Sequence, residues 1–182
     1  MSTVAQRYDV VAEGFTARLE AVGATQWDTL TPCSDWSVRD LVAHVVGVHH
    51  RVAANVSTGA PAEVDPEGDL LTQWRAAAEV VRHALRDEAL ASTVVGGMFG
   101  EQSFESLVGR LVCADTLVHT WDLARATGQD EALDPEALAA AAHFLATLDD
   151  AIRRPGGFGP KIEPAPGADQ QTRFLNFCGR RV

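Results

Sequence analysis

The stretch SFESLVGRLVCADTLVHTWDLARATG, residues 103–128, decides the fold class. Its large apolar residues recur at steps of three and four, the spacing that lines up side chains along one face of a helix. This face includes Phe104, Leu107, Leu111, Val118 and Trp121. Gly128 follows the last turn, where a glycine commonly ends a helix. The stretch therefore predicts one long amphipathic helix over residues 103–127.

The same periodicity recurs along most of the chain. Helices are predicted over residues 3–22, 37–57, 69–87 and 134–153, with a short helical turn over residues 170–178. Ser37 is a predicted N-cap, with Asp40 completing a capping box, and Pro135 follows a second cap at Asp134. Repeats and alternating strand patterns are absent from the sequence. We therefore expect an all-α antiparallel four-helix bundle with an additional helix and a packed C-terminal tail, as a single domain over residues 1–182.

The bundle prediction names core residues and breaks. We expect buried side chains in the bundle at Leu41, Val48, Leu107 and Leu111, and in the tail at Phe174, Leu175 and Phe177. Three apolar residues within four positions favour packing, since full burial of each stabilises by about 1.5–3 kcal/mol. Paired glycines, Gly96 and Gly97, mark a break before the long helix, and the Pro- and Gly-rich residues 155–170 are predicted to be extended.

Composition and charge exclude several classes of function. The chain has 182 residues, 46% apolar and 22% charged, with a net charge of −10. That charge repels phosphate backbones and anionic membrane surfaces, so neither nucleic acid nor a membrane is an expected partner. No apolar run approaches the roughly 18 residues of a membrane span, and no secretory signal is visible. Three irregularly spaced cysteines predict reduced thiols and a cytoplasmic location.

Three residues form the central candidate site. Asp115 and His119 are four residues apart, so their side chains share one helix face, and His44 points along the apolar stripe of another helix. A carboxylate or an imidazole that faces a core needs a partner. The bland interpretation is an internal network in which these residues satisfy each other's charges and hydrogen bonds. The functional one is a divalent metal site that leaves coordination positions open, holding zinc or another borderline ion such as nickel, manganese or iron.

The remaining candidates are weaker. His49 and His50 are expected to be surface residues or to support the ligands, although either could be a ligand and one could line the same cavity as His44. Asp122 either orients a ligand or is a solvated charge. Cys33 is either a small buried thiol or a thiol whose pKa is lowered near a helix N-terminus. His83 and His143 are expected to be ordinary helix residues. Trp36 and Trp121 are expected to be core anchors, although either could line a ligand pocket.

Two motifs resemble a known family. TPCSDWSVRDLVAHVVG (residues 31–47) and LVHTWDLARATGQ (residues 117–129) resemble the N-terminal metal-binding domain of mycothiol-dependent maleylpyruvate isomerases, and still more a family of small actinobacterial metal-binding proteins of the DinB-like superfamily. The closing GP…LNFCGRR is also similar. The resemblance implies a metal on His44, Asp115 and His119, thiol chemistry with mycothiol and a homodimer. Asp115 stands where the isomerase has glutamate, and 182 residues leave no room for the isomerase's second domain.

These observations predict a metal-binding protein, and two functions for it. The first is a metal-dependent S-transferase, or related isomerase, that joins a small-molecule thiol such as mycothiol or bacillithiol to an electrophile. The second is a non-catalytic bundle that holds a metal or a small ligand. Under the bland interpretation above, the bundle is purely structural.

Overall fold

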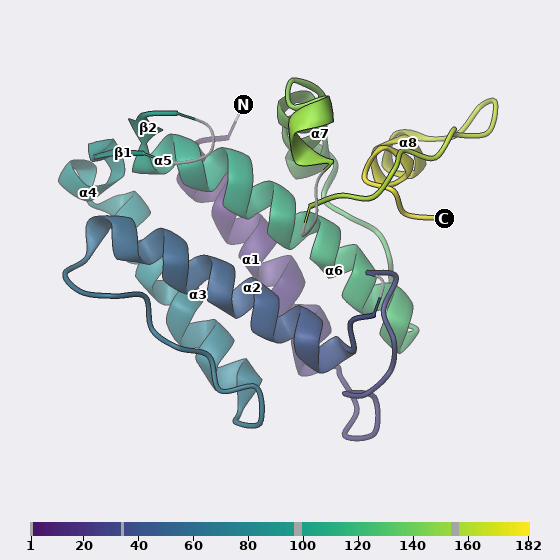
Figure 1. Cartoon of the computed structure of the whole chain (residues 1–182), viewed down its shortest axis with the longest axis horizontal. Helices are drawn as coiled ribbons and strands as arrows, with labels where there is room; N and C mark the ends of the chain where they lie inside the picture. Colours follow the sequence, from purple (N-terminus) through teal and green to yellow (C-terminus); the bar gives the residue numbers. More distant parts are fainter. Residues whose placement is uncertain (1, 34, 97–99, 154–156) are drawn as a thin grey trace.

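Four long helices form a bundle in the computed structural model, which describes residues 2–33, 35–96, 100–153 and 157–182. The predicted all-α fold is confirmed (Figure 1). The bundle helices are α1 (Val4–Glu20), α2 (Val38–Ala53), α3 (Leu70–Arg86) and α6 (Cys113–Thr127). Shorter elements are 3₁₀ turns at Ala54–Val56 and Asp149–Ile152, α4 (Glu88–Ser92), β1 (Val94–Val95), β2 (Gln102–Ser103), α5 (Phe104–Leu107), a π-helical turn (Val108–Val112), α7 (Pro135–Ala146) and α8 (Gln170–Phe177).

Two bundle helices run in each direction. The loop between α2 and α3 runs back along α2. The His50 ring donates a hydrogen bond to the Ala62 carbonyl oxygen, and the Arg39 guanidinium donates one to the Pro66 carbonyl oxygen. α3 therefore starts beside the start of α2, and the two helices run parallel (Figure 1). α1 and α6 run in the opposite direction (Figure 1). α6 is therefore antiparallel to α2, and the two helices are in contact.

The core fills the space between these four helices. Its largest fully buried side chains include Tyr8, Phe15, Trp74, Phe104 and Trp121. Leu41, Val48 and Leu107 are buried as predicted. Among the described residues, no helix is both long enough and apolar enough to cross a membrane.

The predicted long helix over residues 103–127 contains a π-helical turn at Val108–Val112. A π-turn adds one residue to a helical turn, so the faces before and after it are rotated relative to one another. Leu111 lies in this turn and is only partly buried, contrary to the expectation that it joins the core. Apolar spacing alone did not reveal the inserted residue.

Two further expectations needed correction. α7 ends at Ala146 rather than near Arg153, because the Thr147 hydroxyl donates to the Phe144 carbonyl oxygen and the chain turns there. The break before the long helix contains a two-stranded antiparallel hairpin that pairs Val94 with Ser103. Gly97 of the predicted glycine pair lies outside the described residues.

The C-terminal tail packs on the bundle through α8, as predicted. Phe174 and Leu175 are buried, and Phe177 is partly buried against the core. Pro155 and Gly156 lie outside the described residues. From Gly157 to α8 the chain has no helix or strand, which agrees with the extended segment predicted there.

Candidate metal centre

α2 presents His44 to the bundle interior two turns after its N-cap. The Ser37 hydroxyl accepts from the Asp40 backbone N–H at 3.2 Å, and the Asp40 carboxylate accepts from the Ser37 backbone N–H at 2.9 Å. This capping box matches the prediction and fixes where the helix begins, which sets the direction of every later side chain. α6 faces α2 and carries Asp115 and His119 one turn apart.

The structure brings all three predicted residues together. Asp115 Oδ1 lies 3.4 Å from His44 Nε2 and 3.6 Å from His119 Nε2. One potential ligand atom from each residue lies within 4.8 Å of the other two. The side chains of His44 and Asp115 are 26% and 19% exposed and that of His119 only 7%, so solvent reaches the cluster mainly at His44 and Asp115.

The donor geometry fits a small divalent cation. Two ligand atoms bound tetrahedrally at about 2.0–2.1 Å lie about 3.3 Å apart, close to the separations of Asp115 Oδ1 from the two histidine nitrogens. The second oxygen, Asp115 Oδ2, is buried and has no hydrogen-bond partner among the described residues. Burial would raise the pKa of Asp115, but His119 and His44 hold it well below its usual range. The centre thus offers an ionised carboxylate with an unsatisfied oxygen.

The buried ion pair of Asp122 and Arg180 contacts the ring nitrogen of His119 that faces away from the cluster, Nδ1. Asp122 Oδ2 accepts from the His119 Nδ1–H at 3.0 Å, which leaves Nε2 to face His44 and Asp115. Arg180 donates to both oxygens of the same carboxylate, at 2.9 and 2.7 Å. Burial would lower the pKa of His119, but the carboxylates of Asp115 and Asp122 raise it to about 9.

Asp122 is buried, so its interpretation as a solvated charge is wrong, and its hydrogen bond holds His119 in one orientation. Arg180 was not among the residues predicted from the sequence. It lies 58 positions from Asp122, and no local spacing relates the two residues.

Trp36 lies beside the two histidines of the centre. Its ring centroid lies 4.6 Å from that of His44 and 5.9 Å from that of His119. The preceding residue, Asp35, has a φ of 67°, a backbone conformation that non-glycine residues rarely adopt and that often occurs at functional sites. Trp36 thus lines the site, whereas Trp121 is a fully buried core anchor.

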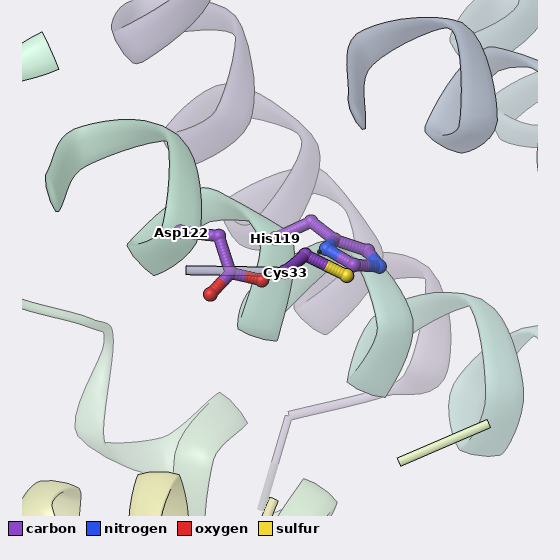
Figure 2. Close-up of side chains that lie close together, drawn as sticks. All are labelled: Cys33, His119 and Asp122. Carbon is purple, nitrogen blue, oxygen red and sulfur yellow. Dashed lines mark hydrogen bonds and ion pairs between the residues drawn. The ribbon is translucent and has the colours of Figure 1, made fainter. Parts of the chain in front are cut away.

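Cys33 lies on the loop before α2, close to His119 and Asp122 (Figure 2). Burial raises the pKa of its thiol, which favours the alternative of a small buried thiol over that of a thiol activated by the helix N-terminus. The three residues also form a possible ligand group, but Asp122 is already neutralised there by Arg180. The other two cysteines, Cys113 and Cys178, are buried, and burial raises the pKa of each to about 12.

The other histidines lie outside the centre. His49 is fully buried against Trp74, and its Nδ1–H donates to the Val45 carbonyl oxygen at 2.9 Å. Among the described residues, neither His49 nor His50 joins a cluster of metal-ligating groups. His83 and His143 are exposed on α3 and α7, as expected of ordinary helix residues.

Comparisons with known proteins cover most of the chain. Residues 9–124 match the family described as mycothiol maleylpyruvate isomerase N-terminal domain. Two proteins of Mycobacterium tuberculosis, from strains CDC 1551 / Oshkosh and ATCC 25618 / H37Rv and both described as uncharacterized, are each 35% identical over 175 residues. The alignment covers 93% of this chain and 93% of each relative. No solved structure matches significantly. The chain therefore belongs to the mycothiol maleylpyruvate isomerase N-terminal domain family.

Proposed function

We propose that this protein binds one divalent metal ion through His44, Asp115 and His119. The observation that carries the proposal is the convergence of three donor atoms around Asp115, whose second oxygen has no partner among the described residues. Two imidazoles and one carboxylate suit zinc, and also nickel, manganese or iron. Three protein ligands leave at least one coordination position open, the arrangement of catalytic zinc sites.

The reaction we propose is transfer of a small-molecule thiol to an electrophile, or a related thiol-dependent isomerisation. The family is named for mycothiol, so mycothiol is the first thiol to test, with bacillithiol as the second. A bound divalent ion would ionise a coordinated thiol. The chain's own residues have supporting parts in this scheme. Asp122 would keep His119 oriented, and Trp36, which lies beside both histidines, would line the site where a thiol and an electrophile approach.

A non-catalytic role in metal or ligand binding is the second candidate. It is favoured by the state of the protein's own thiols, because burial raises the pKa of Cys33 as well as those of Cys113 and Cys178. None of the three is an activated nucleophile. Catalysis would therefore depend on the added thiol, and a protein that binds metal without consuming thiol would be a binding protein.

Metal content tests the shared part of both candidates. Tag-free protein is purified, and its metals are measured by mass spectrometry before and after zinc loading. We expect one ion per chain in the wild type and in His143→Ala, which changes an exposed histidine on α7. His119→Ala should lose most occupancy, because it deletes one of three ligands, and Asp115→Asn should weaken binding less completely. Full occupancy in His119→Ala would refute the site.

Thiol consumption then separates the two candidates. Metal-loaded wild type and His119→Ala are incubated with mycothiol and an electrophilic acceptor, and both the free thiol and the acceptor are followed with time. Loss of thiol that requires the metal and His119 supports the transferase, and conversion of the acceptor without net loss of thiol supports the isomerisation. Stoichiometric metal with neither change supports the binding protein.

A further inference from the structure

We propose that Arg180, from the C-terminal tail, is a positioning residue for the candidate metal centre and acts on His119 through Asp122. The inference rests on the proposed function for its effect on metal affinity, but the contacts that carry it are independent of any metal. It assigns the tail a role in the site in addition to packing.

The three side chains form a continuous chain of charged hydrogen bonds. Arg180 Nε and Nη2 donate to the two oxygens of Asp122, and Asp122 Oδ2 also accepts from His119 Nδ1. The side chains of Arg180 and His119 are 7% exposed and that of Asp122 is fully buried. A bidentate arginine fork fixes the plane of a carboxylate as well as its position. The carboxylate that orients His119 is therefore itself held rigidly.

The fold of the tail places the guanidinium there. Phe174 and Leu175 anchor α8, and the Arg180 backbone N–H donates to the Leu175 carbonyl oxygen at 2.8 Å. The Asn176 side chain donates to the Arg180 carbonyl oxygen at 2.9 Å. Gly179 makes this reversal with a φ of +79°, and a Cβ at this position would lie 3.0 Å from the Pro160 carbonyl oxygen. These contacts turn the chain back after α8, so that Arg180 lies against the bundle.

Removing the guanidinium would leave the buried Asp122 carboxylate without its bidentate partner. Such a group is strongly unfavourable and is relieved by rotation, by hydration or by protonation. Each of these weakens its hold on the His119 Nδ1–H, so Nε2 is no longer confined to the side that faces His44. Partners that orient metal ligands in this way typically contribute 10–100-fold to metal affinity.

A double-mutant cycle on zinc affinity tests this route. We expect Arg180→Met to weaken zinc binding roughly 10–100-fold in the wild-type background. In the Asp122→Asn background, the same substitution should change affinity less than about threefold, because interacting residues are non-additive. Arg180→Lys keeps the charge but loses the fork, so it should restore part of the affinity. This variant also keeps the test informative if Arg180→Met folds poorly.

Arg153→Met is the matched control. Arg153 also ties down the tail, since it donates to the Phe177 carbonyl oxygen at 2.9 Å and to Asp149 Oδ1 at 3.1 Å, but it has no hydrogen bond to Asp122. Its loss should leave zinc affinity within about threefold of the wild type. Equal losses of affinity in Arg153→Met and Arg180→Met would mean that the tail acts only by packing, which overturns the inference.

A second readout does not need metal. In metal-free protein labelled with ¹⁵N-histidine, the hydrogen-bonded His119 Nδ1–H should give a proton signal protected from exchange, assigned by its loss in His119→Ala. The signal should persist in Arg153→Met and weaken or vanish in Arg180→Met. If the wild type binds no metal, the proposed function fails, while this signal still decides the inference. An unchanged signal in Arg180→Met would overturn it.

Discussion

Mild acid should destabilise the protein through His49, a residue outside the candidate metal centre. Its ring is fully buried on α2, and among the described residues Nε2 has no hydrogen-bond partner. Burial lowers the pKa of His49 from 6.5 to about 4. The folded state therefore keeps this ring neutral at pH values where the unfolded chain binds a proton.

The sign and size of the effect follow from linkage. Because the folded pKa is below the unfolded one, the contribution of His49 to stability is complete above pH 6.5 and is lost as the pH falls towards 4. Between pH 7 and pH 5 the loss is about 2 kcal/mol in the free energy of unfolding. The lowered pKa values of Asp115 and Asp122 act mainly below 3.8, and the raised pKa of His119 acts above 6.5. Asp115, Asp122 and His119 therefore contribute little between pH 6.5 and 5, and comparison with a variant that lacks the His49 ring cancels their contribution above pH 6.5.

Urea unfolding of the metal-free protein at pH 7, 6 and 5 measures this loss, with His49→Leu as the comparison. Leucine removes the titrating group and retains an apolar side chain beside Trp74. The free energy of unfolding should fall with acidity about 2 kcal/mol further in the wild type than in the variant. Parallel pH profiles for the two proteins would refute the buried neutral ring.

Two further predictions concern the fold. Leu175→Ala should lower the free energy of unfolding by about 2–5 kcal/mol, because Leu175 is fully buried where the tail packs on the bundle, whereas Leu30→Ala at an exposed position should change it by less than about 0.5 kcal/mol in urea unfolding. The same assay should give opposite signs for two glycines. Gly14→Ala, within α1 and with open space for a Cβ, should stabilise by up to about 1 kcal/mol, and Gly128→Ala, at a φ of +70°, should destabilise by about 1 kcal/mol.

Local rules predicted the metal candidates because the relevant distances are short along the chain. Asp115 and His119 are one turn apart, so their proximity follows from helix geometry alone. His44 required only that α2 face α6, which its apolar stripe indicates. The capping box at Ser37 and the left-handed cap at Gly128 were equally visible, since each depends on a few neighbouring residues.

Features that depend on tertiary contacts were not predictable in this way. The link from Arg180 to Asp122 exists only because the tail folds back over the bundle. The π-turn at Val108–Val112 adds a residue without changing the apolar composition, so the burial of Leu111 was overestimated. Local sequence left two alternatives open for Cys33, and burial, which raises its pKa, decides against the thiol activated by a helix N-terminus. The single domain, the homodimer and the cytoplasmic location stay predictions.

The central claim is that His44, Asp115 and His119 bind one metal ion, and anomalous X-ray scattering from zinc-loaded crystals tests it most directly. Data collected on either side of the zinc absorption edge locate the metal without reference to any assumed site. The account predicts one strong peak between α2 and α6, about 2.0–2.2 Å from His44 Nε2, His119 Nε2 and an Asp115 carboxylate oxygen. A fully loaded crystal with no anomalous peak there, or with the peak beside Cys33 and Asp122 instead, would contradict the account.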